Sequence, residues 1–199
     1  MCSLLAFLSI FTLSDQSYAH QPQEGKVLGT IGPFFSQTHA IHSQDVTNSP
    51  PSLGFGVLGE GDLSSMGGIE IGLFYSFKTY ERVFGASHLV ERVHKVEVPV
   101  GYRHWLLDNL SAGIAFSSSF SVGDPQVVYA DASLGSESTL ARDLTEYGIN
   151  FSVQWEFWTN NLISLILDGR YSFSLSAKTS EDANQYGLML GMKYLIQEK

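Results

Sequence analysis

Residues 69–78 read IEIGLFYSFK, and in this segment large apolar side chains alternate with polar or small ones. Successive side chains of a β-strand point to opposite faces, so strict alternation predicts a strand with one apolar and one polar face. Glu70 and Lys78 mark the polar face, whereas Ile69, Leu73 and Phe77 lie on the apolar face. The segment is long enough for a tilted strand to cross a bilayer, which takes about 9 to 11 residues.

The same alternation recurs along most of the chain. It is clear at residues 96–103, 110–117, 147–157, 163–173 and 186–194, and weaker at 26–37 and 53–60. Together with 69–78 these segments predict about eight strands. The connections between them alternate in length, with long ones at 39–52, 79–93 and 123–145, a middling one at 177–184, and short ones at 61–66, 106–109 and 158–161. This arrangement is typical of an all-β, antiparallel up-and-down barrel with tight turns at one end.

Charged residues are confined to one face of these strands. The apolar faces carry no Asp, Glu, Lys or Arg, while acids and bases share the opposite faces with many glycines and serines. A transmembrane β-barrel turns its apolar face to lipid and its polar face to a narrow lumen, whereas a soluble barrel does the reverse. We favour the transmembrane barrel and keep the soluble barrel as the alternative. We therefore predict a lumen ion-pair network of Glu70, Lys78, Glu97, Arg103, Glu156, Asp168, Arg170 and Lys193. In this network we expect Arg103 and Arg170 to be the hubs that bind Glu70, Glu97 and Asp168, with Glu156 on the preceding strand as a further candidate partner of Arg170.

Aromatic residues gather near both ends of the apolar faces. Rows of this kind occur where membrane strands pass through the two interfaces of a bilayer. The predicted aromatic girdle consists of Tyr75, Phe77, Tyr147, Tyr171, Phe173 and Tyr186 toward the long loops, and of Tyr102, Trp155, Phe157 and Tyr194 toward the short turns.

Composition excludes several classes of protein. The chain has 199 residues, with 11 Lys and Arg against 20 Asp and Glu, a formal net charge of −9. Without a basic cluster, we expect no nucleic-acid partner. Cys2 is the single cysteine, so neither a disulfide framework nor a zinc site of cysteines is available, and we predict no metal and no cofactor.

The N-terminal residues resemble an export signal. Residues 4–13 read LLAFLSIFTL, an apolar run too short to span a bilayer, and the small residues Ser17 and Ala19 fit a cleavage site. We therefore predict a signal peptide at 1–19 and a barrel domain at 20–199. A positively charged stretch before the run is missing, and we expect the true start to lie further upstream.

One hairpin carries a resemblance to a known family. The run Val96 to Tyr102, VEVPVGY, followed after a tight turn by Ala112 to Phe116, AGIAF, resembles the paired strands of small bacterial outer-membrane proteins with an OmpA-like or OmpX-like eight-stranded barrel. The resemblance implies a Gram-negative cell envelope, export through the periplasm, insertion by the barrel-assembly machinery and contact with outer-membrane lipid. Three polar residues follow Ile196, where such barrels usually end on an aromatic residue. Pro99 lacks a ladder donor, so we expect a bulge there.

The predicted function follows from the size of the barrel. Side chains fill an eight-stranded barrel, so we expect a monomeric cell-surface protein with a structural or adhesin-like role and no open pore. The long loops, above all 123–145, are the candidate surface for an extracellular ligand. One alternative is a lipid-modifying enzyme, with no assigned catalytic residue but with His39, His42, Ser43, Ser87, His88 and Glu91 in the loops. The other is a small porin-like channel for apolar solutes.

Overall fold

The computed structural model of the chain describes residues 22–40, 46–47, 51–84, 87–124, 126–130, 145–160, 163–176 and 183–197. Nearly all of them lie in β-strands. No helix among them is long and apolar enough to cross a membrane.

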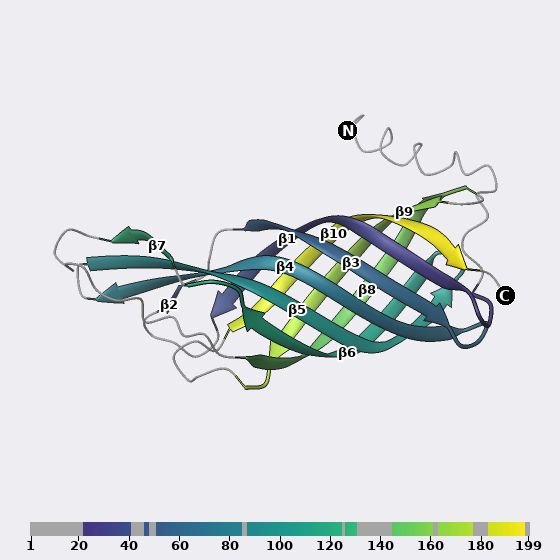
Figure 1. Cartoon of the computed structure of the whole chain (residues 1–199), viewed down its shortest axis with the longest axis horizontal. Helices are drawn as coiled ribbons and strands as arrows, with labels where there is room; N and C mark the ends of the chain where they lie inside the picture. Colours follow the sequence, from purple (N-terminus) through teal and green to yellow (C-terminus); the bar gives the residue numbers. More distant parts are fainter. Residues whose placement is uncertain are drawn as a thin grey trace, which may run out of the picture.

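Eight antiparallel strands close into a barrel (Figure 1). Each barrel strand pairs with its neighbours in the chain, and the first pairs with the last from Leu28↔Leu195 to Ala40↔Ala183. The barrel strands are β1 (Val27–Ala40), β3 (Ser52–Asp62), β4 (Gly67–Phe84), β5 (Ser87–Leu107), β6 (Leu110–Ser121), β8 (Glu146–Thr159), β9 (Ile163–Ser174) and β10 (Ala183–Gln197). Two short strands, β2 (Val46–Thr47) and β7 (Gln126–Ala130), add to the sheet outside the ring. The predicted up-and-down barrel of eight strands is confirmed.

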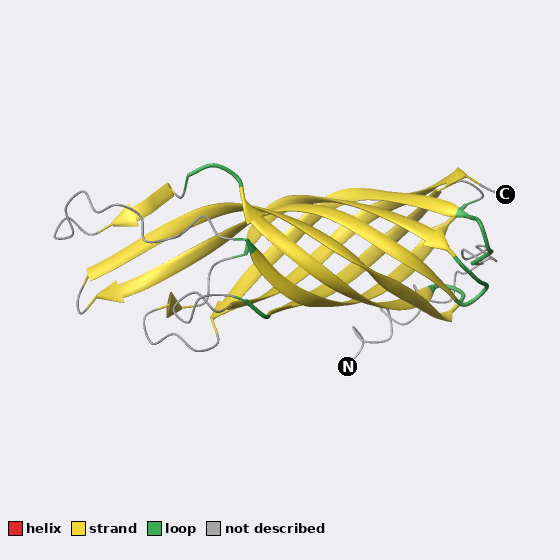
Figure 2. Cartoon of the chain, turned by 60° about the horizontal axis from the view of Figure 1, so that its bottom comes forward, coloured by secondary structure: helices red, strands yellow, loops and turns green. Residues whose placement is uncertain are grey.

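The two ends of the barrel differ. At one end, which we call the short-turn end, β3 and β4 are joined by residues 63–66 and β5 and β6 by residues 108–109. β1 begins and β10 ends there (Figure 1). At the other end, the long-loop end, strands β4 and β5 continue well beyond the ring of strands, with β7 beside them (Figure 2).

The connection predicted at 79–93 is wrong, because most of it is strand. β4 and β5 stay paired from Gly67↔His104 as far as Phe84↔Ser87. Charged residues at 78–92 interrupt the alternation of apolar and polar side chains by which the other strands were predicted. A strand needs that alternation only where one of its faces contacts lipid. Beyond the bilayer, cross-strand pairing alone keeps the hairpin extended. The same holds for β2 and β7, which lie within segments predicted as loops.

Each barrel strand turns alternate side chains inward and outward. On β1, Leu28, Thr30 and Phe34 are buried inside, whereas Ile31 and Phe35 are exposed outside. On β3, Leu58 and Glu60 point inward. These two strands have the weakest alternation in the sequence, and the structure shows which of their residues point inward.

The bulge expected at Pro99 is absent. The ladder between β5 and β6 runs through Pro99↔Ser117, and the ladder to β4 resumes at Phe74↔Glu97 after Ile71↔Val100 without a change of register. A gap of two residue pairs on one side therefore accommodates the missing donor. The register shifts of the barrel strands lie instead near the short-turn end, one of them between Trp105 and Leu107.

Candidate functional site

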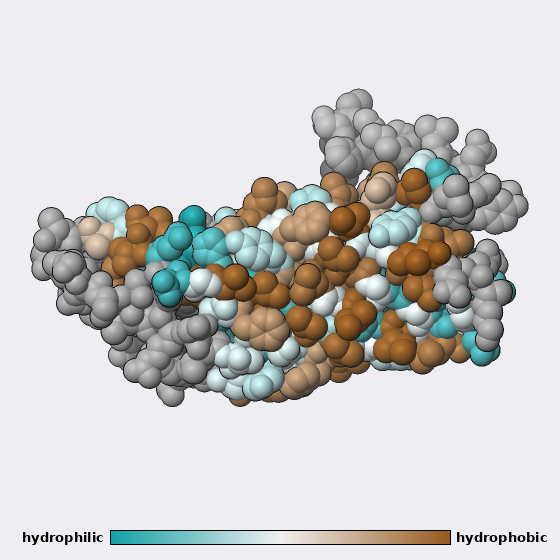
Figure 3. All heavy atoms as spheres, viewed as in Figure 1, coloured by the Kyte–Doolittle hydropathy of each residue, from teal (hydrophilic) through white to brown (hydrophobic). Residues whose placement is uncertain are grey.

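The outer surface of the barrel is apolar. Figure 3 shows apolar residues covering the side of the barrel that faces the viewer. Exposed outward side chains on every barrel strand contribute to it, among them Ile31, Val57, Ile71, Val100, Ile114, Phe151 and Leu190. We call this surface the apolar belt. A soluble barrel would bury this face, so the alternative with an inward apolar face disagrees with the structure.

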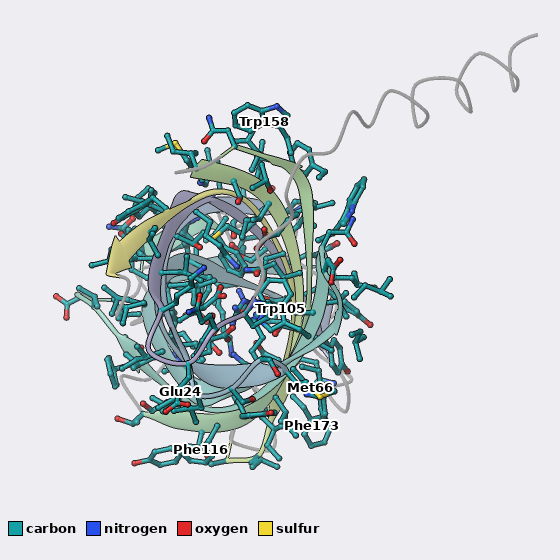
Figure 4. The ribbon with its side chains drawn as sticks, turned by 90° about the vertical axis from the view of Figure 1, so that its right-hand side faces the viewer. Glu24, Met66, Trp105, Phe116, Trp158 and Phe173 are labelled. Carbon is teal, nitrogen blue, oxygen red and sulfur yellow. The ribbon has the colours of Figure 1, made fainter. Side chains whose placement is uncertain are left out.

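The predicted girdle residues all lie on the outward face. Tyr75, Tyr147, Phe173 and Tyr186 are exposed toward the long-loop end, where Tyr171 packs on Tyr186 with ring centroids 5.0 Å apart. Toward the short-turn end, Trp155 and Phe157 lie 5.7 Å apart. Viewed along the barrel, Phe173 and Trp158 point outward, whereas Trp105 lies inside the ring (Figure 4).

Arg103 is the centre of an ionic cluster inside the barrel. Its Nε donates to Glu70 Oε2 at 2.8 Å, and Nη2 also pairs with Glu70 and with Asp168 Oδ2, the latter at 3.2 Å. The hydroxyls of Ser111 and Ser152 accept from Nη1 and Nη2 at 2.9 and 3.0 Å. These residues come from β4, β5, β6, β8 and β9, so one guanidinium joins five strands.

Arg170 shares both acids with Arg103. Its Nε donates to Asp168 Oδ1 at 2.6 Å, and its Nη1 lies 3.0 Å from Glu70 Oε1. Its guanidinium carbon lies 4.6 Å from the centre of the Phe74 ring, a cation–π contact. All four charged side chains are buried and each has a partner of opposite charge, as burial of a charge requires.

A second cluster lies nearer the short-turn end, around Lys193. Its Nζ lies 2.8 Å from Glu60 Oε2, 2.9 Å from Glu156 Oε1 and 2.6 Å from Gln154 Oε1. The ammonium nitrogen is also 5.0 Å from the centre of the Trp105 ring. Two carboxylates therefore share one buried ammonium group.

A third group of charges lies at the long-loop end. Glu146, the first residue of β8, accepts from Lys78 Nζ at 2.6 Å and from Lys95 Nζ at 3.0 Å. Nearby, Glu97 accepts from Asn150 Nδ2 at 2.7 Å and from Ser172 Oγ at 3.4 Å. A cavity beside these residues has a volume of about 30 Å³, enough for a water or two.

Apolar side chains fill the lumen between these charged groups. Along β4 the inward residues run from Glu70 through Gly72 and Phe74 to Ser76 and Lys78. Phe74 thus lies between the Arg103 cluster and the Lys78 group, and its ring centre is 4.9 Å from that of Phe34. The cluster, which we call the apolar layer, consists of Phe34, Leu58, Phe74, Ile166 and Met189.

Inward glycines make room for this layer. A Cβ on Gly56 would lie 2.7 Å from Phe74 Cε1, and one on Gly72 would lie 2.8 Å from Phe74 Cε2. A Cβ on Gly187 would overlap the ring of Phe34. Because these inward glycines have no side chain, they leave the space that the two phenylalanine rings occupy.

The structure changes the partners expected for several charges. The eight residues of the predicted network all point inward and are buried. Glu156 pairs with Lys193 rather than with Arg170, and Glu97 is held by amide and hydroxyl donors rather than by an arginine. The strands of the barrel are tilted and staggered, so residues that meet across the lumen lie at different positions along their strands. The pattern within each strand predicts which residues point inward but not which of them meet.

Sequence reasoning missed several charged residues that point inward, among them Glu60, Lys95 and Glu146. Glu60 lies on β3, where the weak pattern left the phase open, and it binds Lys193. Lys95 and Glu146 were assigned to no strand face, because they adjoin segments predicted as loops. Lys95 lies two residues before Glu97, and Glu146 lies two residues before Gly148. Extending the alternation by one step would therefore have placed both side chains on the inward face.

The serine and histidine residues of the enzyme alternative remain a prediction. Residues 42 and 43 lie outside the described part of the chain, and the placement of the side chains at 39, 87 and 88 is also outside it. Glu91 is described, and its side chain is buried on the inward face of β5. In the described residues no group of three or more His, Cys, Asp or Glu side chains could hold a metal ion.

A closed eight-stranded barrel with an apolar outside and a charged, filled inside has the architecture of the small bacterial outer-membrane barrels. Several solved structures share it, among them the following two. The attachment invasion locus protein Ail of Yersinia pestis, in complex with the heparin analogue sucrose octasulfate, matches with a TM-score of 0.55 at 11% identity, covering 87% of this chain and 100% of Ail. The outer membrane protein OprG of Pseudomonas aeruginosa matches with a TM-score of 0.57 at 8% identity, covering 90% of this chain and 100% of OprG.

These likenesses establish the fold. No protein-family model matches the sequence, and a search of curated proteins finds no match. The chain is therefore similar to Ail and OprG in architecture, at a sequence identity of only 11% and 8%.

Proposed function

We propose that this chain is an integral outer-membrane barrel whose lumen is closed and whose role is structural or adhesive at the cell surface. The observation that carries the proposal is the inverted distribution of polarity. Buried acids and bases fill the inside, and exposed apolar side chains surround the outside. In water this arrangement is unfavourable, whereas in a bilayer the belt contacts lipid and the charges stay paired.

The apolar layer argues against the channel alternative. The rings of Phe34 and Phe74 pack against each other inside the barrel, with ring centres 4.9 Å apart, and belong to a buried apolar cluster with Leu58, Ile166 and Met189. A narrow apolar constriction also repels water, so it blocks ions even where side chains move slightly.

Conductance across planar bilayers tests the closed lumen. We expect the wild-type protein to give no steady ion current, because the apolar layer blocks the passage of ions through the lumen. The variant with Phe34→Ala and Phe74→Ala should pass current, since it removes both rings. Ala112→Ser, on the outward face of β6, is the matched control. A steady current through the wild-type barrel would contradict the proposal and favour a channel.

The hairpin of β4 and β5 supports an adhesive role. It projects beyond the barrel at the long-loop end together with β7, whose five residues are all exposed (Figure 2). Val127, Val128 and Tyr129 form an exposed apolar cluster on β7. Exposed apolar clusters away from the bilayer are typical of protein-binding surfaces. Because three consecutive residues of β7 are apolar and exposed, we infer a protein partner rather than a sulfated polysaccharide.

Adhesion of cells displaying the protein tests this role. We expect them to adhere to surfaces coated with extracellular-matrix proteins more than cells without it, and to lose this gain with Val128→Asp and Tyr129→Asp. Surfaces coated with heparin serve as the comparison. Adhesion to the matrix proteins that survives both substitutions, or adhesion to heparin alone, would contradict a protein partner bound through β7.

A further inference from the structure

A groove interrupts the apolar belt near the short-turn end. It lies on the outside of the barrel across β1, β3, β4 and β5, with a volume of about 370 Å³. Its walls are formed by Val27, Gly59, Gly61, Ile69, Ile71 and Val100. Glu60 and Glu70 also adjoin it, but their carboxylates bind Lys193 and Arg103 in the lumen, so neither carboxylate enters the groove.

Outward glycines create the groove. Four of them lie near the short-turn end, and two are covered by a tyrosine from the neighbouring strand. Tyr194 covers Gly29, where an added Cβ would lie 2.9 Å from Tyr194 Cζ, and Tyr102 covers Gly67. Gly59 and Gly61 have no such cover. A Cβ on Gly61 would meet nothing within 4 Å, and one on Gly59 would meet only Ile71, at 3.4 Å or more.

We propose that this groove holds one acyl chain of a phospholipid from the periplasmic leaflet. The proposal rests on the proposed function, because long loops displayed at the cell surface leave the short-turn end on the periplasmic side of the membrane. An unfilled groove in hydrocarbon surroundings forfeits the dispersion contacts of its walls. A flexible methylene chain restores those contacts without a new polar requirement.

Continuity with the belt supports this occupant. Ile69 and Ile71, at 51% and 56% exposure, form one wall and continue into the lipid-facing surface of β4. The opposite wall at Val27 belongs to β1, which pairs with β3 through Val27↔Gly61. A chain lying along Gly59 and Gly61 would therefore be enclosed on both sides by aliphatic groups, and the depth of the groove would come from the missing side chains.

Photo-crosslinking in phospholipid vesicles tests the proposal. The protein is inserted into vesicles that contain a phospholipid with a diazirine in its acyl chain, and flotation selects inserted protein before irradiation. Mass spectrometry then compares adducts on Val27, Ile69, Ile71 and Val100 with adducts on Ile114 and Phe116, which lie in the belt but do not line this groove. We expect enrichment at the groove. Gly61→Ile, which fills open space, should reduce these adducts about threefold, equivalent to about 0.7 kcal/mol.

Ala112→Ile, an outward substitution on β6 near the same end, is the control and should leave the groove adducts unchanged. Adducts spread evenly over the belt, or unaffected by Gly61→Ile, would overturn the proposal. So would groove adducts that disappear as the protein-to-lipid ratio rises, since the occupant would then be a second barrel. Failure of the wild-type protein to float with vesicles would instead contradict the proposed function.

Discussion

Lys193 and the two carboxylates it holds make a residue-level prediction. Replacing Lys193 with Met leaves Glu60 and Glu156 without their common base in a buried site, and we expect this to lower the free energy of unfolding by about 3–5 kcal/mol. Adding Glu156→Gln should recover part of that loss, because one uncompensated charge is removed. Urea unfolding in detergent micelles of both single variants and the double variant measures the coupling.

The pair of Arg170 and Glu156 provides the comparison for this double-mutant cycle. The two side chains lie on adjacent strands, and the sequence alone favours them as partners, but Glu156 binds Lys193 and Arg170 binds Glu70 and Asp168. We expect a coupling near zero between Arg170→Met and Glu156→Gln. A large coupling in this pair and none in the Lys193 pair would contradict the arrangement of the lumen.

Gly56 and Phe74 test the packing of the apolar layer. A Cβ on Gly56 would lie 2.7 Å from the ring of Phe74, so Gly56→Ala should cost about 1–3 kcal/mol of stability. Phe74→Leu shortens the side chain, and in that background Gly56→Ala should cost less. The same urea unfolding experiment measures both changes. Equal costs in the two backgrounds would mean that the ring does not pack against Gly56.

At the level of single strands, the apolar belt predicts where a charge is tolerated. Leu190 on β10 and Val128 on β7 are equally exposed, at 49% and 50%, but only Leu190 lies in the belt. Leu190→Arg places a charge near the middle of the bilayer, and we expect it to cost about 2–4 kcal/mol. Val128→Arg lies beyond the barrel and should cost little. Refolding into phospholipid vesicles with urea titration measures the two free energies.

These two variants also separate a membrane barrel from a soluble one. In water, arginine at either exposed position would be accommodated with a small effect on stability. Equal and small costs for Leu190→Arg and Val128→Arg would therefore contradict the assignment of the belt to lipid.

The strands differ in how far their sequences predict them. Within β4, alternation from Ile69 to Phe77 is enforced by lipid outside and by a crowded lumen inside, so the parity is readable. Beyond Lys78 the same strand faces water on its outside, the constraint disappears, and the sequence no longer distinguishes strand from loop. On β3, both faces carry glycines, namely Gly54, Gly56, Gly59 and Gly61, so the sequence does not show which face points inward. Pairing with β1 and β4 determines it.

The charged residues of the lumen show a similar division. Their inward direction follows from parity within one strand, which depends only on local alternation. Their partners depend on the tilt and stagger of the whole barrel, which bring Glu60 of β3 to Lys193 of β10 across the lumen. The same geometry brings Lys78 of β4 to Glu146 of β8. Pairing across the lumen is a property of the closed barrel, and no single strand encodes it.

For the whole molecule, the central claim is that a closed barrel with an apolar outside and a filled inside lies in the outer membrane. Separation of inner and outer membranes, followed by gel electrophoresis in detergent with and without boiling, tests this claim most directly. We expect the protein in the outer-membrane fraction, with unboiled protein migrating differently from boiled protein because a closed barrel resists unfolding by detergent. Recovery in the soluble periplasmic wash, with the same mobility before and after boiling, would contradict the account.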